Sequence, residues 1–239
     1  MIERGTELQI TSEPAITYSE CYRLPFLSLF HADCMEIMKQ YPEKYFDLAI
    51  VDPPYGIGIN HNMGRRKGDK HSGHKKVTWD NVTPSDEYFN ELFRVSKNQI
   101  IWGGNYFNLP LTGSWLFWDK LMPEDLSFSM GELAWMTFGN TLRKISLRHH
   151  GFINNDTKKI HPTQKPVDLY DWILKKYSDK NAKILDTHFG SGSIALAVDK
   201  ANRLDKMNLH LTACEIDKEY IDKAIKRISE SIKQGTLSF

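Results

Sequence analysis

The sequence is poor in three features that would each indicate a particular class of protein. Only three of its 239 residues are cysteine, an odd number at wide spacing, which predicts reduced thiols and neither a disulfide framework nor a Cys-x-x-Cys metal site. No apolar run approaches the ~18 residues that cross a membrane, and the N-terminus lacks the layout of a signal peptide, so we expect a cytoplasmic protein. A formal net charge of only +1 argues against a protein that coats nucleic acid by bulk electrostatics.

The charge is distributed unevenly along the chain. Residues 61–77 have a local charge of +5 and residues 141–160 one of +4, which leaves −8 for the remainder. Both segments are rich in Gly, Asn, His or Ser and poor in apolar periodicity, a composition typical of exposed loops. The basic residues that we single out as contacts for a polyanion are Arg65, Arg66, Lys67, Lys70, Lys75, Lys76, Arg143 and Arg148.

Short apolar runs alternate with amphipathic stretches. Seven runs are typical of buried strands and four stretches have helical periodicity, which predicts βαβ units and one doubly wound α/β domain. The predicted strands are Leu27–His31, Leu48–Asp52, Gln99–Gly103, Trp115–Trp118, Leu133–Phe138, Lys183–Asp186 and Leu211–Glu215. The predicted helices are Asp86–Ser96, Val167–Tyr177, Ser193–Arg203 and Lys218–Ile232.

A glycine-rich turn follows the predicted strand Lys183–Asp186. Gly190, Gly192 and Ala195 fit the pattern G-x-G-x-x-A, in which small residues let a ligand approach the backbone. Glu215 ends the next predicted strand, where an acid accepts hydrogen bonds from ribose hydroxyls. The pair predicts a nucleoside cofactor without saying which one; the alternative is a tight turn that binds nothing.

An acidic tetrapeptide, Asp52-Pro53-Pro54-Tyr55, directly follows another predicted strand. Because the carboxyl ends of parallel strands face the ligand crevice, we expect Asp52 in the same cleft as Gly190 and Glu215. A carboxylate and a backbone carbonyl together accept both hydrogens of an exocyclic amine, and a tyrosine ring stacks on a base drawn out of a duplex. The alternative is an acidic turn stiffened by two prolines.

With these motifs the sequence resembles the S-adenosylmethionine-dependent DNA amino-methyltransferases. The tetrapeptide is similar to their catalytic motif in the form associated with adenine N6, Phe189-Gly190-Ser191-Gly192 to their cofactor loop, and Ala213–Asp217 to their ribose-binding strand end. His161–Pro166 resembles a signature that precedes the cofactor loop, and the order of the four motifs is similar to that of the permuted β group. The chain departs from the family loop at Thr187, His188 and Ser193.

The resemblance implies a Rossmann-like methyltransferase fold: a seven-stranded mixed sheet with helices on both faces and its reversed strand near Leu133–Phe138. An N-terminal extension, residues 1–26, would precede a single catalytic domain at 27–239, with a basic loop at 57–80 and a target-recognition segment at about 139–160. The implied catalytic residues are Asp52, Pro53, Pro54 and Tyr55. The implied cofactor contacts are Asp33, Thr163, Lys165, Asp186, Phe189, Gly190, Ser191, Gly192 and Glu215.

The implied reaction is the in-line transfer of a methyl group from S-adenosylmethionine to adenine N6 in double-stranded DNA, after base flipping and without a metal. The two basic segments would contact phosphates, and Arg143 and Arg148 are of a type that reads base edges; an ordinary solvated loop is the alternative for each. Asp119 and Lys120 end a strand on the cleft side and are expected to help shape the base pocket. β-group members are often dimers, which suggests a homodimer.

Other functions explain less of the sequence. Cytosine N4 methylation uses the same amine chemistry and stays open. An NAD-dependent oxidoreductase would leave Asp52–Tyr55 and His161–Pro166 unexplained, and a non-catalytic DNA-binding module would be expected to lose the acid at Asp52. Two histidine pairs, His71/His74 and His149/His150, lack the cysteines or carboxylates that would complete a metal site.

Overall fold

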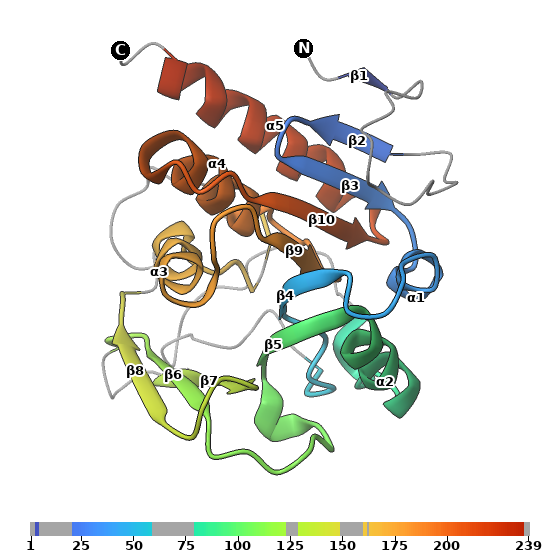
Figure 1. The fold of residues 1–239 in the computed structure, drawn as a ribbon, viewed down its shortest axis with the longest axis vertical. Helices are drawn as coiled ribbons and strands as arrows, with labels where there is room; N and C mark the ends of the chain where they lie inside the picture. The colour runs from blue at the N-terminus through green and yellow to red at the C-terminus, as the bar shows by residue number, and fades with distance from the viewer. Residues whose placement is uncertain are drawn as a thin grey trace, which may run out of the picture.

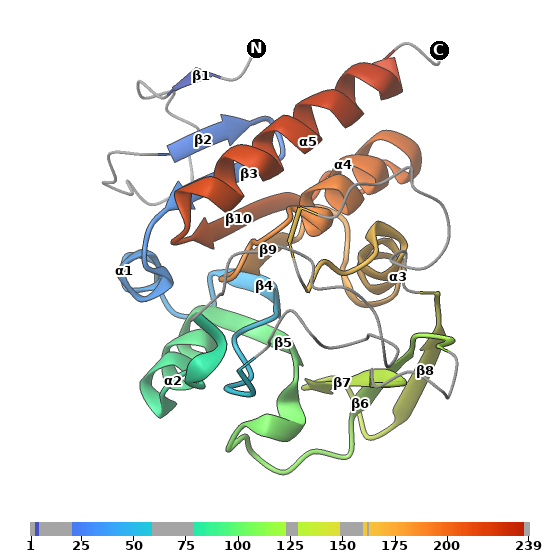
Figure 2. The same cartoon turned by 180° about the vertical axis from the view of Figure 1, so that it is seen from behind.

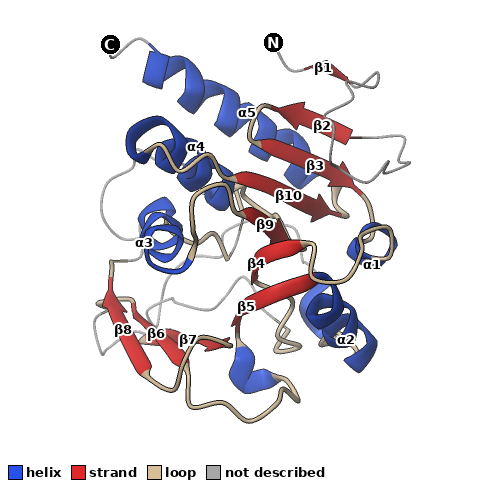
Figure 3. Cartoon of the chain, in the orientation of Figure 1, coloured by secondary structure: helices blue, strands red, loops and turns tan. Residues whose placement is uncertain are grey.

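Ten strands form one mixed sheet in the computed structural model, which describes residues 3–4, 21–58, 79–122, 129–148, 160–161 and 163–236 (Figures 1 and 3). The strands are β1 (Glu3–Arg4), β2 (Cys21–Leu24), β3 (Leu27–His31), β4 (Phe46–Val51), β5 (Ser96–Trp102), β6 (Trp115–Asp119), β7 (Gly131–Met136), β8 (Leu142–Ser146), β9 (Lys183–Asp186) and β10 (His210–Glu215). The α-helices are α1 (Cys34–Met38), α2 (Asp86–Val95), α3 (Val167–Tyr177), α4 (Ser193–Asp205) and α5 (Lys218–Thr236). Two short 3₁₀ helices are η1 (Trp79–Asn81) and η2 (Gly104–Tyr106).

The sheet has a parallel centre and a mixed end. Its order is β1-β2-β3-β10-β9-β4-β5-β7-β6-β8, and the five strands from β3 to β5 are parallel. Strand β7 is antiparallel to both β5 and β6, so the prediction that the apolar run Leu133–Phe138 lies near the reversed strand is confirmed. The doubly wound α/β prediction is confirmed as well.

The prediction of seven strands is wrong. All seven predicted runs do form strands, but β2 pairs antiparallel with β3, the two-residue β1 pairs with β2, and β8 pairs parallel with β6. Apolar patterning missed these strands because they lie outside the core: in β8 only Ile145 is buried. An outer strand is held through its backbone hydrogen bonds and needs no apolar run. Strand β8 also shows that the loop prediction is wrong for residues 142–146.

Alternating side chains along the central strands divide the core into two layers. Leu48 and Ile50 pack in the cluster that includes α3, α4 and α5, whereas Ala49 and Val51 pack in the cluster that includes α1 and α2. This period of two is what a strand buried on both faces requires. The two layers are visible as helices on either side of the sheet, with α4 and α5 lying over it in the view from behind (Figure 2). None of the helices in the described residues is long and apolar enough to cross a lipid bilayer.

The direction of winding reverses between β9 and β4. From β9 the chain passes through α4 to β10 on one side, and from β4 it passes through α2 to β5 on the other. The two strands are nonetheless direct neighbours, with Leu48 opposite Ile184 and Ala49 opposite Leu185. In open α/β sheets the ligand crevice lies at the carboxyl ends of the strands that flank such a point.

The backbone after β5 lies against a side chain that follows β4. Gly103 has a φ of +68°, and a Cβ atom at this position would lie only 2.2 Å from Cε1 of Tyr55. Glycine is therefore required for two separate reasons, the left-handed backbone and the close approach of the tyrosine ring.

We expect Gly103→Ala to destabilise the protein by more than Gly139→Ala does. Gly139 has a similar φ of +62°, but apart from its chain neighbours no heavy atom in the described part of the chain lies within 4 Å of the place that its Cβ would take. The control should therefore lose only the ~1–2 kcal/mol of the backbone term. Gly103→Ala should lose a further ~1–3 kcal/mol from steric overlap. Urea unfolding of both variants measures the difference. Equal losses would mean that Tyr55 moves aside without cost.

Candidate active site

Acidic side chains gather at the carboxyl ends of four adjacent parallel strands. Glu215 and Asp186 are the last residues of β10 and β9, Asp52 is the first residue after β4, and Asp33 lies two residues after β3. Because β3, β10, β9 and β4 are consecutive in the sheet, these residues lie along one edge of it. The sequence predicted that Asp52 shares a cleft with the glycine turn and Glu215, and the strand order brings the three segments to that edge.

Both oxygens of the Asp52 carboxylate have partners. The hydroxyl of Tyr55 donates to Oδ1 at 2.6 Å, and Nζ of Lys165 lies 2.5 Å from Oδ2. The side chain of Asp52 is 15% exposed and that of Lys165 only 2%, so the pair is nearly removed from water. A lysine from the His161–Pro166 signature, predicted to contact the cofactor, therefore lies against the acid of the tetrapeptide.

The ion pair is part of a longer row of charges. Lys165 Nζ also lies 3.0 Å from Oε2 of Glu132, and Oε1 of Glu132 lies 2.5 Å from Nζ of Lys120. The row Lys120–Glu132–Lys165–Asp52 alternates in sign and has no net charge, which is how charges persist in a poorly solvated site. Although burial alone would raise it, the two ammonium groups lower the pKa of Glu132 to about 2.

Topology explains why these four side chains meet. Strand β7 runs opposite to β5, so its first residues, Gly131 and Glu132, lie at the edge where the parallel strands end. Strand β6 ends at the same place, since Asp119 pairs with Gly131, and Lys120 follows it directly. Burial raises the pKa of Asp52, and Glu132 adds to the effect, while Lys165 opposes it. Although burial alone would lower it, the two carboxylates raise the pKa of Lys165.

The ring of Tyr55 is enclosed by aromatic and backbone neighbours. Tyr106 stacks on it, with ring centroids 5.1 Å apart and planes 14° apart, and Phe107 approaches it edge-on at 6.2 Å. Burial and the nearby carboxylates raise the pKa of Tyr55 well above its usual value, so its hydroxyl remains a donor to Asp52. The stacking of Tyr55 on a base stays a prediction, and one face of the ring is covered by Tyr106.

The backbone after the two prolines is held by one buried acid. Oδ1 of Asp80 accepts hydrogen bonds from the amides of Tyr55 at 2.8 Å and Gly56 at 3.2 Å, and the amide of Gly58 donates to the Asp80 carbonyl at 2.9 Å. Asp80 is only 2% exposed. The residues on either side of the predicted basic loop are therefore tied together, while residues 59–78 lie outside the described part of the chain.

The glycine turn is bound to the acid at the end of the next strand. The amide of Gly190 donates to Oε2 of Glu215 at 2.8 Å, and the amide of Asp217 donates to Oε1 at 3.0 Å. Gly190 and Gly192 have φ values of +51° and +69°, and the second of them immediately precedes α4. A carboxylate beside a glycine turn at a helix start is the donor and acceptor set that fits the ribose of a nucleoside cofactor.

The remaining predicted cofactor residues have different surroundings. Phe189 and Ser191 are buried, and burial raises the pKa of Asp186 to about 8, which leaves that carboxyl largely protonated at neutral pH. Asp33 is exposed and caps α1 by accepting from the amide of Met35 at 2.8 Å. Thr163 Oγ1 bonds Nδ1 of His161 at 3.0 Å. Cofactor contact by each of these residues stays a prediction.

The departure from the family loop at Thr187 and His188 has a structural role. Oγ1 of Thr187 bonds the hydroxyl of Tyr88 on α2 at 2.6 Å and Nδ1 of His188 at 2.9 Å. Burial lowers the pKa of His188 to about 4, so the ring is neutral at physiological pH. Thr187 and His188 therefore link the segment before the glycine turn to helix α2.

Three residues near Asp52 did not follow from the sequence: Asp80, Tyr106 and Glu132. Glu132 stands as a lone acid at the start of an apolar run, a signal that it faces a partner, but nothing local identifies that partner. Asp119 and Lys120 were both expected at the base pocket. Lys120 is linked to the tetrapeptide through its ion pair with Glu132, whereas Asp119 pairs with Lys144 of β8 at 2.8 Å.

The predicted DNA contacts are described only in part. Arg143 lies on β8 and Arg148 follows it, and both are exposed. The six basic residues of the first segment, and the histidines at 71, 74, 149 and 150, lie outside the described residues. Within the described ranges, no group of three His, Cys, Asp or Glu side chains is arranged to hold a metal ion.

Comparison with known proteins identifies the family. The description "DNA methylase", for a family of N6 and N4 methyltransferases, matches residues 102–226, more than half of the chain. The chain is 25% identical over 254 residues to the type II methyltransferase M.HinfI of Haemophilus influenzae, covering 85% of this chain and 68% of that one.

Two solved structures share the fold. One is M1.HpyAVI in complex with SAM, with a TM-score of 0.52, 20% identity and coverage of 84% of this chain and 99% of that one. The other is the PvuII DNA methyltransferase, described as cytosine-N4-specific, with a TM-score of 0.53, 13% identity and coverage of 87% and 92%. The sheet with its switch point between β9 and β4 is thus a Rossmann-like methyltransferase fold, and the chain belongs to the DNA methylase family of S-adenosylmethionine-dependent N6/N4 amino-methyltransferases.

Proposed function

We propose that the protein transfers a methyl group from S-adenosylmethionine to N6 of adenine in duplex DNA. The observation that carries this proposal is the position of Asp52-Pro53-Pro54-Tyr55 at the carboxyl end of β4, across the switch point from the glycine turn after β9. An acceptor for an exocyclic amine and a turn suited to a nucleoside are thereby presented at one edge of the sheet.

In this proposal Asp52 and the Pro53 carbonyl accept the two hydrogens of the amine, so that the nitrogen lone pair points at the methyl group. The bound cofactor would supply an already activated methyl on a sulfonium, so the chain needs no nucleophile of its own. Catalysis then rests on proximity and orientation. Glu215 and the turn at Gly190 and Gly192 would hold the ribose. Tyr55 would stack on the flipped base, and the face that Tyr106 covers becomes available only when Tyr106 moves.

Methylation of cytosine N4 is the second candidate. It uses the same acceptor pair, and a protein of the same fold is described as cytosine-N4-specific. Adenine is favoured by the resemblance of the tetrapeptide, with Asp at position 52, to the form associated with N6 chemistry. We further propose that the two basic segments contact the phosphates of the DNA backbone, and that the oligomer is a homodimer.

Analysis of methylated DNA distinguishes the two bases. Duplex DNA of mixed sequence is incubated with the protein and S-adenosylmethionine, digested to nucleosides and analysed by mass spectrometry. We expect N6-methyldeoxyadenosine. Finding N4-methyldeoxycytidine instead would assign the enzyme to cytosine, and finding no methylated nucleoside would contradict the proposed function.

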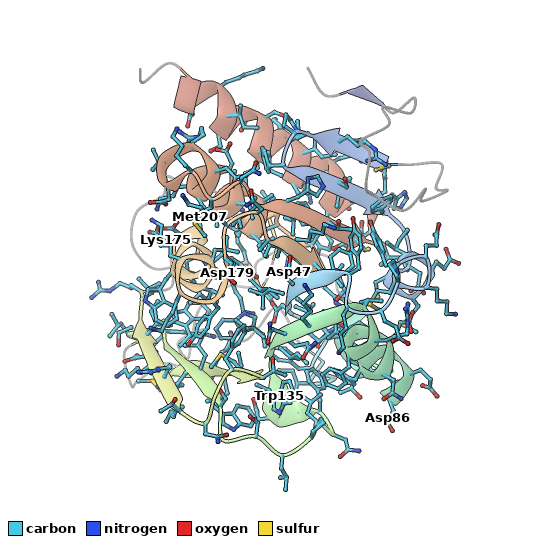
Figure 4. All side chains as sticks on the ribbon, viewed as in Figure 1. Asp47, Asp86, Trp135, Lys175, Asp179 and Met207 are labelled. Carbon is cyan, nitrogen blue, oxygen red and sulfur yellow. The ribbon has the colours of Figure 1, made fainter. Side chains whose placement is uncertain are left out.

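Asp52→Ala should reduce methyl transfer at least about 100-fold, because the amine loses the acceptor that orients it. Cofactor affinity, measured by calorimetry, should change little, since the ribose contacts lie on the other side of the switch point. The matched control is Asp47→Ala, at the start of the same strand (Figure 4). The carboxylate of Asp47 pairs with Lys97 at 2.7 Å. Undiminished transfer by Asp52→Ala would contradict the mechanism.

Replacing Arg65, Arg66 and Lys67 together with Ala should weaken DNA binding on all sequences. Phosphate contacts release counterions, so removing three of them should lower the slope of log affinity against log salt by about 3. A control variant that removes three exposed lysines of α5 and the loop before β10, Lys206, Lys226 and Lys233, should leave the slope unchanged. Equal slopes in the two variants would exclude the first basic segment from the DNA interface.

A further inference from the structure

We propose that Lys165 is a positioning residue for Asp52: held in place by Glu132, which Lys120 holds in turn, it keeps the Asp52 carboxylate ionised and fixes its rotation. This inference deepens the proposed function and rests on it. It gives Lys165 a role different from the cofactor contact that the sequence predicted.

The ammonium group of Lys165 has an acceptor for each of its three hydrogens. Its nitrogen lies 2.5 Å from Oδ2 of Asp52, 3.0 Å from Oε2 of Glu132 and 3.4 Å from the hydroxyl oxygen of Tyr55. The ring of Trp102 lies 5.1 Å from the same nitrogen. Because only 2% of the Lys165 side chain is exposed, water has almost no access to replace one of these partners.

The row also fixes where Lys165 and Asp52 lie. Glu132 holds Lys165 from β7, and Lys120 holds the far oxygen of Glu132 from the end of β6. Oδ1 of Asp52 is held by Tyr55 and Oδ2 by Lys165, so the plane of the carboxylate is set by two bonds on opposite oxygens. Each oxygen of a carboxylate accepts about two hydrogen bonds, so capacity for an incoming amine remains.

The charge state of Asp52 decides whether both of its oxygens can accept hydrogen bonds from the amine. An ionised carboxylate only accepts hydrogen bonds, whereas a protonated one would present an O–H toward the amine. The groups that face Asp52 are Tyr55 from the loop after β4, Glu132 from β7, Tyr170 from α3, Asp186 from β9 and Lys165. Lys165 is the cation among these neighbours, so the ionised form of Asp52 depends on it.

The test uses two substitutions that change charge in opposite directions. Lys165→Gln removes the cation but keeps a donor, and Glu132→Gln removes an anion with little change of shape. The control is Lys97→Gln, whose lysine is 54% exposed and pairs with Asp47 at the far end of β4. The single-turnover rate of methyl transfer is measured for each protein from about pH 5 to about pH 9, with DNA and S-adenosylmethionine saturating.

We expect the acidic limb of the Lys165→Gln profile to move to higher pH by about 1–3 units, because the pKa of Asp52 rises when its cation is lost. At pH values below both limbs the rate should be about 10- to 1000-fold lower than that of the wild type, and it should recover as the pH rises. The acidic limb of Glu132→Gln should move to lower pH, because an anion next to Asp52 is gone. Lys97→Gln should superimpose on the wild type.

A merely structural role would lower the plateau of both variants and leave the limbs where they are, which would overturn the proposal. A loss of cofactor affinity in Lys165→Gln with an unmoved limb would also overturn it and return Lys165 to the cofactor site. If Lys165→Gln does not fold, Glu132→Gln decides alone: a limb moved downward supports the proposal, and one unmoved or moved upward overturns it. No transfer by the wild type would contradict the proposed function itself, whereas an active wild type with unmoved limbs contradicts this inference alone.

Discussion

One constraint organises the site: Asp52, which the proposed mechanism requires as a hydrogen-bond acceptor, lies where burial disfavours its charge. Asp52 lies at the end of a strand buried on both faces, with the carboxylate of Glu132 as an acidic neighbour. Removing a carboxylate from water costs several kcal/mol unless a cation and hydrogen bonds replace the solvent. Lys165 supplies that cation and Tyr55 supplies a hydrogen bond to the same carboxylate.

The contacts around Asp52 depend on the mixed order of the sheet. In an all-parallel sheet every strand would bring only its last residue to the crevice, but the reversed β7 brings its first residues there. Glu132 therefore reaches the same edge as Asp52, and the end of β6 brings Lys120 beside it. The reversed strand lets two strands that carry no recognised motif contribute charge to the site.

The same topology separates what the sequence predicted from what it could not. The tetrapeptide, the glycine turn and Glu215 were found because each is a local pattern at the end of an apolar run, and the parallel order alone brings them together. Lys120 was expected at the base pocket, but Glu132 was not, because its contact with Lys165 beside Asp52 depends on the pairing of β7 with β5 and β6. The outer strands β2 and β8 were missed for a related reason: they are held by backbone pairing and leave little trace in the side-chain pattern.

The buried row also bears on the net charge of +1, which on its own argued against a nucleic-acid partner. The charges of Lys120, Glu132, Lys165 and Asp52 sum to zero, so this row contributes no net charge. Ion pairs such as Lys97–Asp47 and Lys144–Asp119 cancel in the same way near the surface. A phosphate backbone responds to the charge that faces it within about a Debye length and not to the sum over the chain. A net charge of +1 is therefore compatible with the proposed DNA substrate, since the basic charge is gathered in residues 61–77 and 141–160.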